Sequence, residues 1–467
     1  MIGSSLPEAR AWVLPLAAAL LLFSLSPLAA DTAADGAVVL TVEQAVSQAK
    51  GNQPLIRQAV DAVEAARARI GEAQSAYYPV VSGTASYNRL SDESFAISSV
   101  LPPSLASQVP SQYQGLLAAP FSLVPVNMWD FNLGLNQVIT QFGKRDVQVR
   151  LAKSVLASAR IGVDQVTTAI SYQAAQVFYT ALFLREQGKA LDEQYQNLQE
   201  HLHVIQVREN TGSATRLEDL GTRVRMAALQ SQRADVESQF QKQEIALRQL
   251  TGLAPSTPIM LSGGFDPGTA PAADASLVDS ALQKRTDVRQ AVEAESAADL
   301  GQRLASLAPW PTVSAHASMG FKNGALPDIN VPAFNWVAGV QVNVPIFQGF
   351  LQARAQEEAR KKMEGAKENT SAVRLNATTQ VLQAAQDVRA ARLQVEISAG
   401  ALDQARQMVE VAKVQYDIGV ISNLEYLDAQ TSLESANISN LAALYKEVLS
   451  EYALRQASGE TLQTKGD

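Results

Sequence analysis

The chain has 467 residues, of which 47% are hydrophobic but only 6% aromatic. That content excludes a disordered protein, and its richness in alanine favours thin, closely packed helices over a thick globular core. A net charge of −8 argues against a nucleic-acid partner. The absence of cysteine excludes disulfides and a lipid-bearing N-terminal cysteine.

The first residues predict a secretory signal peptide over 1–30. A basic residue precedes an apolar run from Ala11 to Leu25, and Ala29-Ala30 before Asp31 suits cleavage by signal peptidase. A permanent membrane helix needs about 20 apolar residues. An uncleaved anchor is therefore the less favoured alternative.

Two copies of one structural unit fill the rest of the chain. Arg57-Gln-Ala-Val recurs as Arg289-Gln-Ala-Val, and the turn at Gly212 recurs at Gly419. Such repetition predicts duplicated architecture. The expected segments are a first repeat over 31–252, a linker over 253–275, a second repeat over 276–459 and a C-terminal tail over 460–467. Each repeat is expected to begin with one helix, near 42–76 and near 276–308.

A long helical hairpin is predicted in each repeat, over 143–252 and over 349–459. Apolar residues recur at strict seven-residue spacing from Val149 to Ile205 and again from Val381 to Tyr416. A heptad period predicts left-handed coiled-coil packing. At 1.5 Å per residue, the longer arm of each hairpin extends about 100 Å. An ordinary globular domain has no use for such an arm.

Four segments alternate between apolar and polar residues and are predicted as strands, at about 78–90, 127–139, 311–322 and 335–345. Strands of an outer-membrane barrel alternate in this way. A half-buried soluble sheet would alternate too. The polar faces, interpreted as small and neutral, favour a water-filled lumen and so the barrel.

Four strands cannot close a membrane barrel, because the smallest barrels have eight. Open strand edges in lipid would leave backbone groups without hydrogen-bond partners. Several chains must therefore share one barrel. Three copies of four strands give a 12-stranded barrel, so we expect a homotrimer, although two or four copies also satisfy the arithmetic.

The order of these elements resembles the TolC-type outer-membrane efflux proteins, the outer membrane factor family. The stretch Val344-Pro-Ile-Phe-Gln-Gly at the strand-to-helix junction and the second hairpin tip, 416–429, carry the resemblance. It implies a mainly α fold with membrane β: an internally duplicated α-helical coiled-coil barrel below the shared 12-stranded transmembrane β-barrel of a trimer. It also implies a place in the Gram-negative outer membrane, with a long periplasmic extension.

The resemblance further implies a channel and not an enzyme. Such a duct passively conducts substrates out of a tripartite efflux pump, with a periplasmic adaptor, an inner-membrane transporter and outer-membrane lipid as partners and with no cofactor. The same architecture serves type I secretion of polypeptides. Drugs, metal ions, metabolites and polypeptides therefore all stay open as substrates. A secreted coiled-coil scaffold without channel activity is the alternative of another class.

The hairpin tips are the expected gate. Glu425 and Asp428 lie three residues apart on one helix, so several chains would stack them into two carboxylate rings that attract cations. A solvated helical N-terminus would also favour acidic residues. The resemblance makes Glu425, Asp428, Glu218 and Tyr416 candidate gate residues, and Asp219 follows Glu218. The arginine that partners this tyrosine in the family would fall at Ile421, which leaves Arg216 as a weaker substitute.

The same tips match the region where the family docks adaptors. The candidate docking residues in the first tip are Gly212, Ser213 and Leu217, and those in the second tip are Gly419, Val420 and Leu424. Ordinary helix-turn chemistry explains glycine and serine there equally well. No metal site is expected from the three histidines, and no catalytic motif is present. The segment 89–126 is expected to form an extracellular loop.

Overall fold

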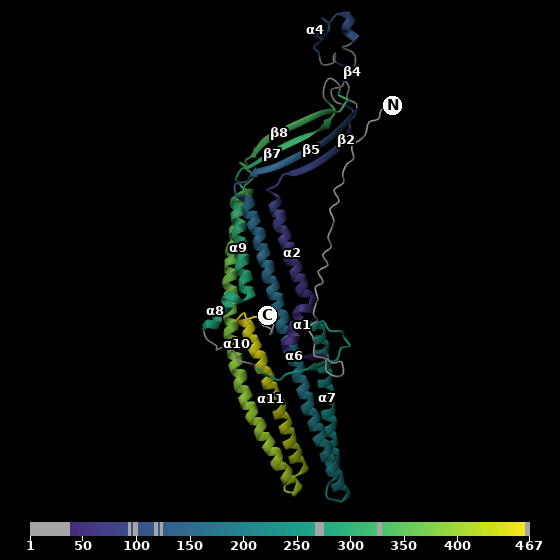
Figure 1. The fold of residues 1–467 in the computed structure, drawn as a ribbon, viewed down its shortest axis with the longest axis vertical. Coiled ribbons are helices and arrows are strands. Elements are labelled where there is room, and N and C mark those ends of the chain that lie inside the picture. The colour runs from purple at the N-terminus through teal and green to yellow at the C-terminus, as the bar shows by residue number, and fades with distance from the viewer. Residues whose placement is uncertain are drawn as a thin grey trace, which may run out of the picture.

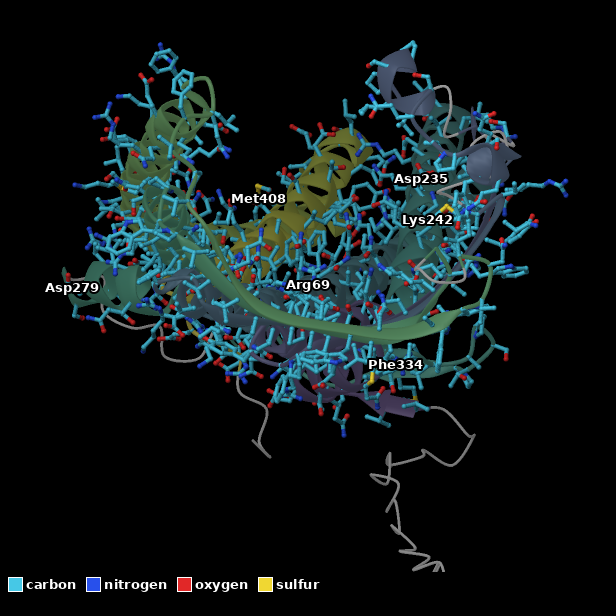
Figure 2. All side chains as sticks on the ribbon, turned by 90° about the horizontal axis from the view of Figure 1, so that it is seen from above. Arg69, Asp235, Lys242, Asp279, Phe334 and Met408 are labelled. Atoms are coloured by element: carbon cyan, nitrogen blue, oxygen red, sulfur yellow. The ribbon has the colours of Figure 1, made fainter. Side chains whose placement is uncertain are left out.

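The computed structural model describes residues 38–91, 95–96, 101–115, 120–121, 125–266, 275–324 and 329–462. The predicted signal peptide, 1–30, lies outside these residues, as does the end of the predicted tail. The molecule is elongated, with a curved sheet above a long stack of helices (Figure 1). Seen along its long axis it is an open arc, in which Asp279 and Lys242 lie at opposite sides (Figure 2).

The four predicted strands form one antiparallel sheet in the order β2-β5-β7-β8. Their bounds are Val80–Arg89 for β2, Asn127–Thr140 for β5, Thr312–Lys322 for β7 and Ala333–Asn343 for β8. The apolar face is exposed and carries Trp129, Phe131 and Leu133 on β5, Phe321 on β7 and Trp336 on β8. A face this apolar needs a nonaqueous surrounding.

The opposite face of the sheet is polar but not wholly neutral. Asp130 and Lys322 lie opposite each other on β5 and β7, so the interpretation of this face as neutral throughout is wrong. Gly320 is required for the close approach of the same two strands. A Cβ at Gly320 would lie 1.9 Å from the carbonyl oxygen of Phe131, so any side chain there would separate β7 from β5.

The segment above the sheet, predicted as the loop 89–126, holds only short elements among its described residues. They are β3 (Phe95–Ala96), α4 (Pro103–Ala106), the 3-10 turn Ser111–Tyr113 and β4 (Pro120–Phe121). β3 pairs with β4 in an antiparallel ladder. This segment projects from the end of the sheet that lies away from the helices (Figure 1).

Each repeat carries a helical hairpin. The first consists of α6 (Lys144–Asn210) and α7 (Arg216–Thr251), and the second of α10 (Leu351–Asp417) and α11 (Asn423–Ala457). α6 and α10 both have 67 residues, which corresponds to about 100 Å. The heptad column of α6 is buried or half-buried at every member. Heptad packing therefore joins each long helix to its neighbours.

The helix predicted near 42–76 and its counterpart near 276–308 are each divided in two. The pieces are α1 (Val42–Asn52) and α2 (Pro54–Ser75), then α8 (Ala275–Lys284) and α9 (Thr286–Ser306). Gln53 is extended, with φ −69° and ψ 124°, because a proline ring excludes the helical conformation at the residue before it. Arg285 is extended as well, and its guanidinium donates to the carbonyl oxygen of Ala457 at the end of α11.

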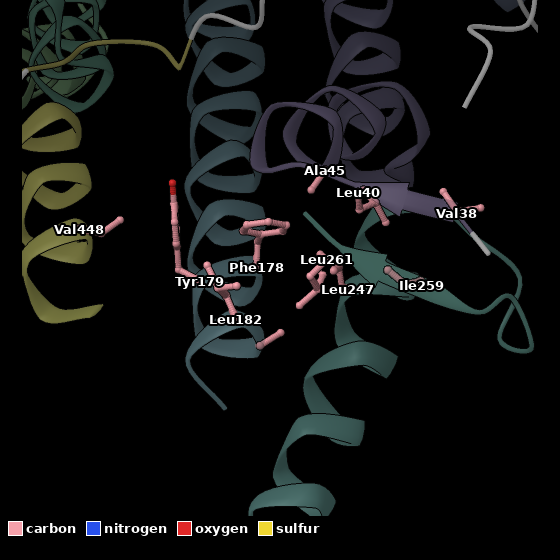
Figure 3. Packing of buried hydrophobic residues seen from close by; sticks show 11 residues of the cluster. Val38, Leu40, Ala45, Phe178, Tyr179, Leu182, Leu247, Ile259, Leu261 and Val448 are labelled. Atoms are coloured by element: carbon pink, nitrogen blue, oxygen red, sulfur yellow. The ribbon is translucent and has the colours of Figure 1, made fainter. Parts of the chain in front are cut away.

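The segment predicted only as a linker, 253–275, contains the strand β6 (Ile259–Leu261). It pairs in parallel with β1 (Val38–Leu40). This small sheet covers a core at mid-height, where buried side chains of several helices meet: Phe178 and Leu182 of α6, Leu247 of α7 and Val448 of α11 (Figure 3). Since α11 belongs to the second repeat, this core ties the two repeats together.

Candidate gating and docking tips

The first tip joins α6 to α7 through Gly212, whose φ of +74° is the left-handed conformation that favours glycine. Thr215 caps α7, and its backbone N–H and hydroxyl donate to Oε1 of Glu218 at 3.3 and 3.0 Å. In return, the backbone N–H of Glu218 donates to the Thr215 hydroxyl. This reciprocal pair is a capping box. Glu218, a predicted gate acid, therefore closes the end of its own helix.

Asp219, the next residue, is buried. Its Oδ2 accepts from Nη1 of Arg216 and from Nε of Arg223, both at 2.9 Å. The hydrogen bond from Arg223 is the main cause that lowers the pKa of Asp219 below its ordinary 3.8. All three side chains belong to α7. Asp219 thus fixes the first turns of that helix.

The second tip repeats this chemistry. Gly419 has φ +77°, and Ser422 caps α11 with its backbone N–H and hydroxyl donating to Oε2 of Glu425 at 2.7 and 2.8 Å. These hydrogen bonds lower the pKa of Glu425, because they stabilise the carboxylate. Glu425 is exposed and charged. Asp428, one turn further, accepts from Nη2 of Arg225 at 2.8 Å, so this carboxylate is paired with the first hairpin.

A buried aromatic cluster joins the two hairpins just above the tips. Tyr416 of α10 stacks on Tyr426 of α11, with ring centroids 5.4 Å apart and planes 14° from parallel. His201 of α6 lies 5.2 Å from the first ring and 4.7 Å from the second. Its Nε2 is 2.6 Å from Oδ1 of Asn423. Burial raises the pKa of Tyr416, so both tyrosines stay neutral.

Arg208 of α6 supplies a second contact between the hairpins. Its guanidinium carbon lies 4.7 Å from the centroid of the Tyr416 ring, and its Nη2 lies 3.4 Å from Oδ1 of Asp417. Arg216, the substitute considered from sequence, pairs only within its own hairpin, with Asp219 and with Glu209. The sequence-based candidates did not include Arg208. The repeat that aligns Gly212 with Gly419 also aligns Arg208 with Gln415, the residue before Tyr416, and this was the available signal.

The predicted docking residues form the exposed rim of the tips. Leu217 is 79% exposed in the first tip, and Val420 and Leu424 are 66% and 61% exposed in the second. Leu220, Val224 and Ile418 extend this apolar rim. Ser213, Gly212 and Gly419 are exposed between them. Apolar side chains that project from a polar helical end are typical of a protein-binding surface.

Two features are absent from the described parts of the chain. No group of three or more acidic, histidine or cysteine side chains is placed to hold a metal ion. None of the helices there is both long and apolar enough to cross a membrane.

Comparison with known proteins decides the family. The model of the outer membrane efflux protein family matches residues 45–253 and 277–460, one range in each repeat. The chain belongs to the outer membrane efflux protein family. Family members are transport ducts of the Gram-negative outer membrane and not enzymes. The resemblance to TolC-type channels noted in the sequence is thereby confirmed.

Individual relatives agree with the family. The pyoverdine export outer membrane protein OpmQ of Pseudomonas putida is 24% identical over 333 residues, which cover 71% of this chain and 70% of OpmQ. The solvent efflux pump outer membrane protein SrpC of the same species is 26% identical over 448 residues, covering 93% and 87%.

Solved structures confirm the fold. The CmeC outer membrane channel of Campylobacter jejuni superposes with a TM-score of 0.74 at 19% identity, covering 91% of this chain and 87% of CmeC. CusC superposes with a TM-score of 0.75 at 19% identity, covering 90% and 92%. The long helical hairpins and the four-stranded sheet predicted from the sequence are therefore the fold of this chain.

Proposed function

We propose that the chain forms a homotrimeric exit duct of a tripartite efflux pump, through which substrates leave passively. The free edges of the sheet support this most directly. Among the described residues, β2 and β8 each pair on one side only, and an unpaired edge in hydrocarbon leaves backbone groups without partners. A neighbouring copy that pairs β8 with β2 satisfies both edges, and the arc of one chain then becomes part of a closed wall.

The chain has no cysteine, which makes cross-linking a direct test of this arrangement. We expect Thr84→Cys on β2 combined with Gln341→Cys on β8 to give covalent species up to three chains in outer-membrane fractions treated with a flexible thiol cross-linker. Each single variant can form covalent species of at most two chains, because each chain then carries only one thiol. A ladder that stops at two chains or reaches four would reject the trimer, and purely monomeric protein would reject a shared barrel.

Small molecules are the proposed substrates, because the relatives named above export pyoverdine or solvent. A periplasmic adaptor and an inner-membrane transporter would deliver these substrates to the tip end of the duct. Deleting the gene should either lower the tolerance of the cells to organic solvents or stop their siderophore export. A plasmid that carries the intact gene should restore whichever property is lost. Loss of a secreted polypeptide with unchanged solvent tolerance would point instead to type I secretion. A purified protein without conductance in lipid bilayers would support the scaffold alternative.

The exposed carboxylates of the second tip are proposed as the cation filter. Glu425→Gln with Asp428→Asn removes both charges, and glutamine can still complete the capping box with Ser422. We expect this double variant to lose cation selectivity and block by divalent cations, because ring charges set the local potential. Ser422→Ala, which removes the hydroxyl of the capping box but keeps both carboxylates, is the control for capping alone. Unchanged selectivity of the double variant would remove Glu425 and Asp428 from the gate.

The apolar rim is proposed as the adaptor surface. Leu217→Glu and Leu424→Glu place charges on side chains that contact little in the isolated chain, since both are more than half exposed. We expect conductance to persist and pump-dependent resistance to fall, because a charge in an apolar interface is costly. Ile245→Glu, near the end of α7 that lies away from the tip, is the matched control, since Ile245 is 63% exposed. Full resistance in the Leu217 and Leu424 variants would place the adaptor elsewhere.

A further inference from the structure

A buried histidine lies at the junction of the two hairpins. His201 belongs to α6, three residues after Leu198 in the heptad column, and only 7% of its surface is exposed. His203, two residues further along the same helix, is exposed instead. The position of His201 is therefore one where a coiled coil ordinarily carries an apolar side chain.

The hydrogen bond and the ring contacts of His201 reach the second hairpin. Its Nε2 lies 2.6 Å from Oδ1 of Asn423, so in this arrangement Nε2 carries a proton that it donates. Asn423 is the first residue of α11, and it directly follows the Ser422 that holds Glu425 in the capping box. The imidazole also lies against the rings of Tyr416 and Tyr426. One side chain of α6 thus contacts the last turn of α10 and the first turn of α11.

The surroundings favour the neutral imidazole. Burial is the largest cause that lowers the pKa of His201 below its ordinary 6.5. The hydrogen bond to Asn423 acts in the opposite direction. Of the charged groups that face the ring, Arg208 on α6 disfavours the imidazolium, whereas Asp417 on α10 and Glu218 on α7 favour it. The two tyrosines are neutral near physiological pH and supply no counter-charge. The ring of Tyr416 attracts cations, as its contact with Arg208 shows, but burial is still the largest cause of the shift.

We propose that His201 is a gate residue of the duct, whose neutral imidazole holds the hairpin tips together and whose protonation in acid releases them. The inference rests on the proposed duct function and adds a means of regulating it. It depends only on contacts within one chain, and so it holds for any number of copies in the barrel. Separation of the hairpins then parts His201 from Asn423 and loosens the start of α11, which carries Glu425.

The sign follows from proton linkage. In the joined state the pKa of His201 is depressed, whereas in a separated state that admits water it returns to about 6.5. The separated state therefore binds more protons below that pH, and acid favours separation. Between pH 6.5 and the depressed value, the joined-to-separated ratio falls up to about tenfold per pH unit for each chain. Above pH 7.5 the ratio is constant.

Single-channel recording in planar bilayers provides the functional test. We expect the wild-type open fraction to rise several-fold between pH 7.5 and 5. His201→Gln, which offers a neutral amide donor and cannot titrate in this range, should remove most of that rise. His203→Gln is the matched control and should behave as the wild type. A rise that persists in His201→Gln, or a wild type whose open fraction does not change, would overturn the proposal.

A second measurement separates this proposal from the duct itself. The sequence has three histidines, so two-dimensional NMR of imidazole-labelled protein in detergent micelles resolves each one, and single variants assign them. We expect His201 to titrate below 6.5 and to be the Nε2–H tautomer at neutral pH. A pKa at or above 6.5 would refute the proposal even if the protein conducts. Conductance that is absent at every pH, with the expected His201 pKa, would instead refute the duct.

Discussion

Replacing Arg208 by alanine should loosen the hairpin tips by a calculable amount. The arginine makes two contacts across the hairpins, one with the ring of Tyr416 and one with the carboxylate of Asp417. A cation–π contact at a partly exposed site contributes about 0.5–1 kcal/mol. An ion pair whose carboxylate is 55% exposed contributes at the low end of about 0.2–1 kcal/mol. The total is about 0.7–1.2 kcal/mol per chain, equivalent to about a 3- to 8-fold shift in the joined-to-separated ratio.

The assay is single-channel conductance at pH 7.5, where His201 stays neutral. We expect Arg208→Ala to raise the open fraction by about that factor, and Arg208→Lys to give an intermediate value, because an ammonium keeps the charge but not the planar stacking. Arg216→Ala is the matched control. Arg216 is 67% exposed and pairs only with residues of its own hairpin, so its loss should leave the open fraction unchanged.

The outcome can refute the reasoning. If Arg208→Ala conducts as the wild type does, with an unchanged melting temperature as evidence of correct folding, Arg208 does not hold the tips. If Arg216→Ala opens the duct instead, the gate is controlled by packing within the first tip and not by the contacts between the hairpins.

Three further predictions concern stability. Gly252→Ala should cost about 1–3 kcal/mol of unfolding free energy, because φ is +73° and the new Cβ would lie 2.7 Å from the Cβ of Asn52. Gly71→Ala, inside α2 with nothing within 4 Å, is the control and should be neutral or stabilising. Equal melting temperatures of the two variants would contradict this prediction. Phe178→Ala should cost about 3–5 kcal/mol in urea unfolding, since the ring is 1% exposed in the core that joins the repeats, and a cost below about 1 kcal/mol would show that this core collapses readily. The pKa of Asp219 is lowered mainly by Arg223, so its contribution to stability is present above pH 3.8 and lost as pH falls through the lowered value; acid unfolding of Asp219→Asn should lack that component, and an identical acid transition would oppose it.

Much of the fold could be predicted from local pattern. The heptad column that begins at Val149 indicated a long coiled-coil arm, and the alternation that includes Trp129 indicated a strand with one apolar face. The glycines at 212 and 419 indicated where the hairpins turn. The break before Pro54 could have been predicted from the sequence, whereas the small sheet in the predicted linker could not, because it depends on a neighbouring segment. The short strand β6 has only three residues, too few for a period, and it forms because β1 lies beside it.

The candidate site divides in the same way. The two glycines indicated where the tips lie, and the resemblance to TolC-type proteins pointed to their acids as gate candidates, which stay a prediction. Sequence reasoning could not show that Glu218 and Glu425 both complete capping boxes, nor that Asp428 pairs with Arg225. It also did not find Arg208 or His201, since neither belongs to the tip sequence. Both lie on α6, and their contacts with the second hairpin depend on how the hairpins pack.

The duplicated unit, the length of its arms and the two faces of its strands are all readable in the chain, because they follow from an internal repeat and from periodicities of seven and of two residues. Which side chains meet between the hairpins is set by the folded molecule. The approach of α6 to α10 and α11 sets His201 beside Tyr416, Tyr426 and Asn423. That approach depends on packing between segments far apart in the chain, and no local pattern of residues records it.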